Sequence, residues 1–194
     1  MKRLLLFVLG LFMIFAGANA ASPAWTLDKA HSNIIFSVRH MVISEVTGTF
    51  KDFNVSLQSV KEDFGDAEIN ATINVNSINT ENDRRDAHLK TDDFFNAEKY
   101  PTITFKSDSV EKIGEGHFVI KGLLTIRDST HEVSIDAVHN GTLMSKNGER
   151  AGWKATLTIN RFDYGLRWNQ ALEAGGLIAG SDVTIVFNLE FVRS

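Results

Sequence analysis

The chain has 194 residues, 23% of them charged, and its formal net charge at pH 7 is −4. This acidic balance argues against nucleic-acid binding and against electrostatic docking on anionic lipid. The sequence contains no cysteine, which excludes disulfide bonds and a lipid anchor attached to a cysteine.

Residues 1–20 predict a secretory signal peptide. Lys2 and Arg3 give a basic start, residues 4–15 form an apolar run, and Ala18-Asn19-Ala20 has the small-x-small pattern of a cleavage site. An uncleaved anchor helix is the alternative, but the run is shorter than the about 20 residues that a membrane span needs. We therefore expect cleavage after Ala20 and a periplasmic or secreted protein with one soluble domain over residues 21–194.

In the rest of the chain apolar and polar residues alternate, a pattern typical of strands with one buried face. The clearest alternations lie at residues 34–38, 67–75, 118–126, 153–160 and 183–191, and weaker ones at 49–57, 102–106 and 132–138. Together they predict about eight strands. Turn residues at 114–116, 127–129 and 147–148 predict antiparallel hairpins between neighbouring strands.

An open sheet of this size would expose its apolar face, so we expect it to close on itself or to fold into a sandwich. The fold class that we predict is all-β, an extended eight-stranded antiparallel barrel. Such a barrel is filled by side chains or holds one small ligand. Ala67, Ala71, Gly122 and Ala155 place small residues on the inward faces. They are compatible with a cavity and equally with tight packing of small against large residues.

Two long segments, residues 82–105 and 161–180, do not follow the strand rhythm, and long irregular segments in β proteins often have a function. Residues 83–89 predict a short helix with Asn82 as its cap. The arginines of these segments suit a phosphate or carboxylate head group, or ordinary salt bridges with neighbouring aspartates.

Motifs for catalysis and metal binding are weak. The six histidines show no metal-site spacing, and the chain has no GxSxG, phosphate-binding loop or dinucleotide-binding motif. Asp86 and His88 lie close in sequence, and Asp92-Asp93 are adjacent carboxylates, but a cap or a solvated turn explains the latter pair as well. We predict neither a metal nor a catalytic residue.

Several motifs in chain order resemble the YceI-like family. They are Trp25-Thr26-Leu27-Asp28, His31-Ser32, Arg39-His40, Gly48-Thr49-Phe50, Ser77-Ile78-Asn79-Thr80, Arg85-Asp86-Ala87-His88-Leu89, Asp93-Phe94-Phe95, Tyr100-Pro101, Gly122-Leu123-Leu124-Thr125-Ile126 and Asn160-Arg161-Phe162-Asp163-Tyr164-Gly165. The resemblance implies an exported bacterial protein whose lipocalin-like barrel holds an isoprenoid or another long apolar lipid. Residues 127–132 depart from the family pattern, a change that we expect to alter one hairpin and that says little about the cavity.

We therefore expect a protein that carries or sequesters a polyisoprenoid, quinone or fatty-acid derivative, without another cofactor. The expected lumen residues are Phe36, Val38, Phe53, Ile69, Ile73, Phe94, Phe95, Phe105, Leu124, Ile126, Trp153, Leu157, Ile185 and Phe187. The expected polar contacts at the mouth are His40, Arg84, Arg85, His88 and Arg161.

Two alternatives stay open: an enzyme that acts on such a lipid with Asp86 and His88, and a stress or redox accessory protein. The expected partners are the lipid and a transient membrane or membrane-protein contact, with a monomer or homodimer and no nucleic acid.

Overall fold

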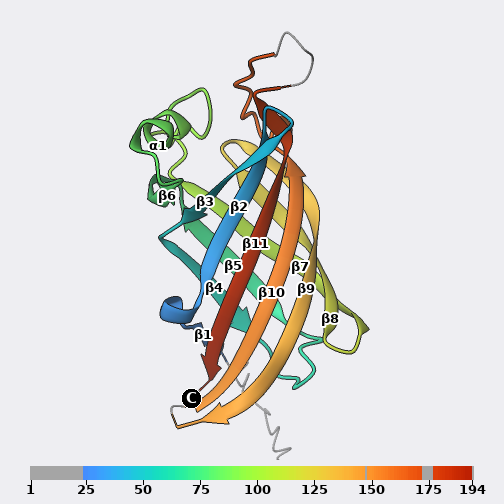
Figure 1. Ribbon diagram of the computed structural model, residues 1–194. Helices are drawn as coiled ribbons and strands as arrows, with labels where there is room; N and C mark the ends of the chain where they lie inside the picture. The colour runs from blue at the N-terminus through green and yellow to red at the C-terminus, as the bar shows by residue number, and fades with distance from the viewer. Residues whose placement is uncertain (1–23, 147, 172–176, 194) are drawn as a thin grey trace, which may run out of the picture.

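The computed structural model describes residues 24–146, 148–171 and 177–193, so the expected signal peptide lies outside the described residues. Within these ranges the regular structure is almost entirely strand (Figure 1). The strands are β1 (Ala24–Leu27), β2 (Asn33–His40), β3 (Ser44–Phe50), β4 (Phe53–Gln58), β5 (Glu68–Asn74), β6 (Ile78–Asn79), β7 (Thr102–Gly114), β8 (His117–Ile126), β9 (Ser129–Ser145), β10 (Gly148–Asn160) and β11 (Ala179–Arg193). The helical elements are η1 (Lys29–His31), η2 (Val75–Ser77) and α1 (Asp83–Leu89). No helix in these ranges is long and apolar enough to cross a membrane.

The strands form one antiparallel sheet that closes into a barrel. Its hydrogen-bonded order is β1-β4-β5-β7-β8-β9-β10-β11, and β11 pairs back with β1 through Thr26↔Val192 and Leu27↔Phe191. Closure pairs every strand of the ring on both sides, which removes the exposed edges that an open sheet would have. The predicted closed eight-stranded barrel is confirmed.

At three places around the barrel, two consecutive strands follow one another along the wall with a break between them. β1 and β2 both pair with β11, β3 and β4 follow one another around residues 51–52, and β5 leads through η2 into β6. The breaks lie side by side, because the N–H of Lys51 donates to Ser77 O (3.1 Å) and that of Asn74 to Asp52 O (2.9 Å).

At one end of the barrel, the upper end in Figure 1, the wall is completed by irregular chain. There β2, β3 and β6 extend the sheet beyond the closed ring, and residues 80–101, which contain α1, connect β6 to β7. The helix begins and ends at the predicted residues, and the side chain of Asn82 caps it by accepting from the N–H of Arg85 (3.0 Å).

The predicted hairpins are also present. β7 pairs with β8, β8 with β9 and β9 with β10, each in antiparallel register. Asn147, part of the last predicted turn, lies outside the described residues. β7 begins directly after Pro101, where the missing N–H of proline is tolerated.

Alternation along the strands places the core inside the barrel. In β10, Trp153, Leu157 and Ile159 are buried, while Lys154 and Thr158 between them are exposed. This alternation follows from the period of two in strand geometry and gives the lumen an apolar surface.

Candidate functional site

The barrel lumen holds two cavities that adjoin along its length. The lower cavity has a volume of about 80 Å³ and an entirely apolar lining. The upper cavity, at the α1 end, has a volume of about 320 Å³, which is within the range of small-molecule sites. Ile103 lines both cavities. The lumen is therefore mainly apolar, and its larger cavity lies at the upper end.

Most of the expected lumen residues line one of these cavities. Those on the lower cavity are Ile69, Ile73, Phe105, Leu124, Trp153, Leu157 and Phe187. Those on the upper cavity are Phe36, Val38, Phe94, Phe95, Ile126 and Ile185. Phe53 is buried but lines neither cavity, because it lies beside the break between β3 and β4, where it packs into the core.

The small inward residues serve two purposes. Ala67, Ala71 and Ala155 line the lower cavity, where their short side chains leave room. Gly122 instead allows close strand packing, since a Cβ there would lie 2.8 Å from both Phe105 Cζ and Ser107 Cα. The small residues thus leave room for a cavity at some positions and allow tight packing against large residues at another.

Five cationic or titratable side chains line the upper cavity. They are Arg39, His40, Arg85, His88 and Arg161. The described lining residues of this cavity include no aspartate or glutamate. Arg84, by contrast, is exposed on α1 and is not part of the lining. The polar end of the lumen therefore has a positive lining above an apolar interior.

Arg161 is held by backbone carbonyls. The side chain is only 3% exposed, and its guanidinium donates to Leu166 O (2.6 Å), Gly180 O (2.7 Å), Trp168 O (2.8 Å) and Ala179 O (2.9 Å). Burial lowers the pKa of this guanidinium. The alternative of a salt bridge with neighbouring Asp163 does not apply, because the guanidinium of Arg161 bonds to these carbonyls instead.

Arg85 belongs to a network that anchors α1. Its Nε donates to Thr80 Oγ1 and its Nη2 to Thr80 O, both at 2.7 Å. The same Thr80 hydroxyl donates to Asp86 Oδ1 (2.5 Å), which also accepts from the Thr80 N–H (2.9 Å). Asp86 is buried by these contacts and holds the first turn of α1 against the end of β6.

His88 does not pair with Asp86, so the dyad considered for catalysis does not form. Its Nε2 lies 2.8 Å from Asp93 Oδ2, and its ring packs edge-on against Phe94 (5.1 Å) and Trp168 (5.6 Å). In a helix, residues two apart point in different directions, which separates Asp86 from His88. Asp86 turns inward to Thr80 instead.

The two irregular segments pack against each other over the upper cavity. The N–H of Trp168 donates to Asp93 O (3.2 Å), and the rings of Phe94 and Trp168 lie 5.6 Å apart. Arg127 also joins them, because its Nη1 donates to Phe94 O (2.7 Å) and Gly165 O (3.2 Å). Arg127, in the stretch 127–132 that departs from the family pattern, therefore holds both segments that cover the cavity.

A YceI-like domain matches residues 25–191. The chain belongs to the YceI-like family. A UPF0312 protein of Staphylococcus aureus (strain bovine RF122 / ET3-1) is 40% identical over 171 residues, which cover 86% of this chain and 96% of that relative.

Solved structures have the same fold as this YceI-like barrel. BcnA of Burkholderia cenocepacia superposes with a TM-score of 0.73 at 22% identity, covering 84% of this chain and 98% of BcnA. The YCEI protein of Campylobacter jejuni gives 0.70 at 32% identity, covering 87% and 97%. A polyisoprenoid binding domain from Saccharophagus degradans gives 0.65 at 18% identity, covering 89% and 99%.

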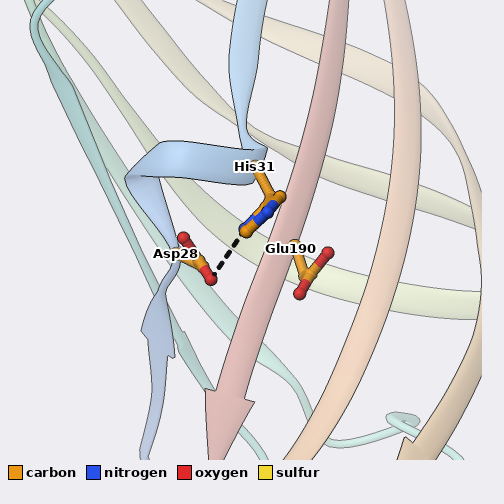
Figure 2. Close-up of side chains that lie close together, drawn as sticks. All are labelled: Asp28, His31 and Glu190. Atoms are coloured by element: carbon orange, nitrogen blue, oxygen red, sulfur yellow. Dashed lines mark hydrogen bonds and ion pairs between the residues drawn. The ribbon is translucent and has the colours of Figure 1, made fainter.

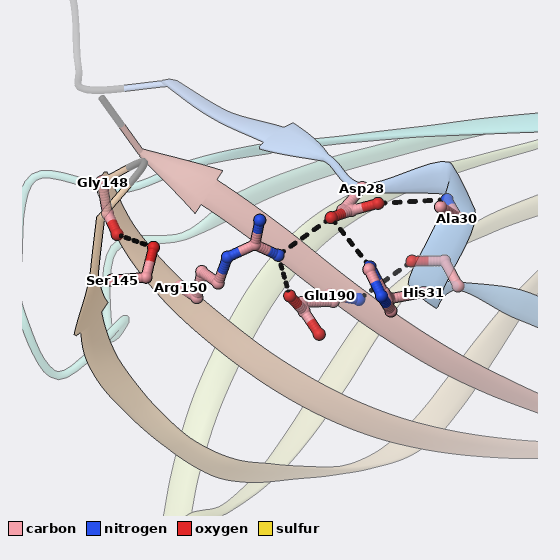
Figure 3. Close-up of polar contacts among 8 residues, drawn as sticks. Asp28, Ala30, His31, Ser145, Gly148, Arg150 and Glu190 are labelled. Atoms are coloured by element: carbon pink, nitrogen blue, oxygen red, sulfur yellow. Dashed lines mark hydrogen bonds and ion pairs between the residues drawn. The ribbon is translucent and has the colours of Figure 1, made fainter.

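A second cluster of titratable groups lies on the outside of this YceI-like barrel. Asp28, His31 and Glu190 come together where η1 packs against β11, with ligand atoms within 4.8 Å of one another (Figure 2). Arg150 lies between the carboxylates, and its Nη1 donates to Asp28 Oδ2 (2.9 Å) and to Glu190 Oε1 (Figure 3). The bonds to Arg150 and then to His31 lower the pKa of Asp28 to about 2.

The guanidinium of Arg150 already supplies the positive charge that these carboxylates need. Asp28 also accepts from the N–H of Ala30 (3.1 Å), which caps η1. The cluster therefore links η1 to β10 and β11 through Arg150. Because Arg150 already neutralises the carboxylates, this geometry does not favour a metal ion.

The upper cavity is also lined by residues that sequence patterns do not reveal, among them Arg39, Leu166, Trp168 and Ile178. Strand alternation directs Arg39 outward, but β2 ends one residue later, and this exposed residue takes part in the lining at the rim. The other three lie in the segment 161–180, which has no periodicity from which an inward face can be read.

Proposed function

We propose that the protein is an exported carrier or sequestering protein that holds one long apolar lipid in the barrel lumen. The observation that carries this proposal is the gradient along the lumen: a lower cavity with only apolar lining residues adjoins an upper cavity whose lining includes three arginines and two histidines. An amphiphile with its tail below and its polar group above matches this gradient.

The energetics favour a chain-like ligand. Each buried CH₂ contributes about 0.8 kcal/mol, so affinity should rise with tail length until the tail fills the lower cavity. The head group would then need only a few polar contacts at the upper end. The polyisoprenoid binding named for the Saccharophagus degradans structure supports the same class of ligand.

The positive lining favours a head group rich in hydrogen-bond acceptors, such as a phosphate, a carboxylate or a quinone carbonyl. His40, Arg85 and His88 lie on this lining, together with Arg39. The guanidinium of Arg161 is mostly occupied by carbonyls, so we assign it to shaping the site and to its positive potential.

Native mass spectrometry and lipid extraction of protein freshly purified from its host test the proposal. We expect a bound molecule with a prenyl or acyl chain, and re-uptake of such chains after delipidation. Recovery of empty protein that takes up neither kind of chain would refute lipid binding. Detection of the protein in periplasmic or culture-medium fractions tests the proposed export.

A second candidate is an enzyme that acts on the bound lipid. The observation in its favour is the His88–Asp93 pair, which has the 2.8 Å separation of a histidine oriented by a carboxylate and lines the upper cavity. Lipid turnover that His88→Ala abolishes, with lipid binding retained, would support the enzyme. A bound lipid recovered chemically unchanged favours the carrier.

A further inference from the structure

The turn between β2 and β3 exposes three consecutive apolar side chains. Met41, Val42 and Ile43 are 41%, 52% and 89% exposed. The turn lies at the upper end of the barrel, the same end as α1, beside the segment between β10 and β11 (Figure 1). Isolated exposed apolar residues are common, but three in a row on one turn are a feature of surfaces that meet another apolar phase.

The backbone of this turn makes its sequence still more unusual. The N–H of Ile43 donates to His40 O (3.2 Å), and the two central residues, Met41 and Val42, have φ values of 49° and 67°. A β-turn with two positive φ angles favours Asn-Gly, and a β-branched residue is strongly disfavoured there. Neither backbone conformation nor solvation accounts for Met-Val-Ile, so the sequence points to a function of the exposed side chains.

The turn is attached to the rim of the upper cavity. Val38 and His40, at the end of β2, line that cavity. Ile178, next to the turn, also lines it, and its carbonyl accepts from the N–H of Met41 (2.9 Å). An apolar phase in contact with the turn would therefore lie directly beside the rim of the lumen.

We propose that the apolar turn Met41–Ile43 inserts into the surface of a lipid bilayer and places the rim of the upper cavity against it. This inference rests on the proposed function, because a bilayer is the source or destination of a lumen lipid. A tight turn with three apolar side chains offers little surface to fill a protein groove, whereas side chains of this kind can enter the interfacial region of a bilayer. Insertion shortens the distance over which the lipid tail would be exposed to water.

The net charge of the chain sets the character of this contact. With a formal charge of −4, the protein gains no overall attraction to anionic lipid. Docking by the turn is therefore expected to depend mainly on apolar contact and to occur on neutral phosphatidylcholine vesicles, with only a modest, salt-sensitive gain on anionic vesicles from the arginines at the rim.

The test replaces the turn by a sequence that suits its backbone. The triple variant Met41→Asn, Val42→Gly, Ile43→Ser removes the apolar side chains and relieves the disfavoured φ angles. We expect its Tm to be equal to or higher than that of the wild type, so weaker vesicle binding would not reflect misfolding. The matched control is Leu143→Ser, Met144→Ser, which removes side chains 62% and 77% exposed near the turn between β9 and β10. This turn lies at the opposite end of the barrel (Figure 1).

The measurement is co-flotation with phosphatidylcholine vesicles and with phosphatidylethanolamine–phosphatidylglycerol vesicles, using protein purified from its host in its natural form. Wild type and control are expected to bind equally, and the turn variant to bind roughly tenfold or more weakly, since it loses most of three inserted side chains. The proposal is overturned if the wild type does not float with vesicles, if the turn variant floats as the wild type does, or if the control loses as much binding.

Lipid extraction from the same preparations separates the two proposals. Bound lipid in all three proteins without a difference in flotation would refute docking and leave the carrier function standing. Loss of flotation in the turn variant, with no lipid in any preparation, would refute the carrier function and leave docking standing.

Discussion

At the scale of single residues, Gly122 controls how closely β7 and β8 approach. A Cβ at this position would collide with the backbone carbonyl of Lys106 and would lie 2.8 Å from Ser107 Cα. The pairing of β7 with β8 shifts register between Ser107 and Ser109, next to this contact. Backbone atoms cannot move aside as a flexible side chain does, so the position requires glycine.

Gly122→Ala is therefore expected to lower the free energy of unfolding by about 1–3 kcal/mol, the usual cost of overpacking. Gly152→Ala is the control, because its Cβ would meet Asn140 Cβ at 3.7 Å, an ordinary contact. Urea unfolding of both variants checks the prediction. Equal stability of the two alanine variants would contradict it.

Asp28 makes the stability contributed by the cluster around Arg150 sensitive to acid. Its pKa is about 2 in the folded chain, against an ordinary value of 3.8, because of the bonds to Arg150 and His31. A lowered pKa contributes stability above the ordinary value, and that contribution disappears as the pH falls through the folded value. The free energy of unfolding is therefore expected to fall between about pH 4 and pH 2.

Asp28→Asn should flatten this part of the pH dependence, because it removes the titrating carboxylate. Urea unfolding at stepped pH measures the effect. The control is Asp108→Asn, which removes an exposed carboxylate outside the cluster. If Asp28→Asn and Asp108→Asn change the acid slope alike, the Asp28–Arg150 bond does not govern it.

At the scale of elements, Arg161 determines how the segment between β10 and β11 folds over the upper cavity. Its four donated bonds reach residues 166, 168, 179 and 180, so one side chain ties both ends of the segment to the end of β10. Arg127 holds the facing segment in a similar way through Asp92 O (3.0 Å) and Phe94 O (2.7 Å). The cover of the upper cavity thus depends on arginine–carbonyl bonds more than on regular structure.

Arg161→Met is expected to destabilise the protein by about 3 kcal/mol or more, because it leaves several buried carbonyls without donors. Arg161→Lys should cost nearly as much, since a single ammonium cannot reproduce the planar fork that contacts four carbonyls. Urea unfolding gives the free energies, and amide exchange at Trp168 reports the local opening. A fully stable lysine variant would show that only the charge of Arg161 matters.

At the scale of the whole molecule, closure of the barrel converts one face of the sheet into an enclosed apolar volume. Alanines at inward positions keep part of that volume empty, and Ala155 on β10 lines the lower cavity from the middle of a long strand. A bulky side chain at this position would occupy the space proposed for the lipid tail.

Ala155→Phe is accordingly expected to reduce lipid uptake at least about tenfold, because several CH₂ groups of the tail lose their place at about 0.8 kcal/mol each. Lys154→Phe adds an aromatic side chain one residue away on the exposed face of β10 and serves as the control. Lipid uptake by delipidated protein, measured by native mass spectrometry, compares them. Uptake by Ala155→Phe equal to that of the control would place the tail elsewhere.

The sequence by itself determined the features that depend on near neighbours along the chain. Alternation predicted the strands and their inward faces, turn residues predicted the hairpins, and Asn82 predicted the start of α1. These succeed because strand periodicity and helix capping involve residues only a few positions apart. The motifs in chain order also predicted the family correctly.

Only the tertiary structure decided what the long polar side chains bind. Arg161 contacts carbonyls instead of Asp163, Asp86 bonds to Thr80 instead of His88, and Arg127 joins two segments that are distant in sequence. The tertiary structure also decided where the strands break along the barrel wall. It likewise decided that the Met41–Ile43 turn is exposed beside the rim of the upper cavity. A flexible charged side chain bonds to whichever partners the closed barrel brings within reach, and local sequence does not determine those partners.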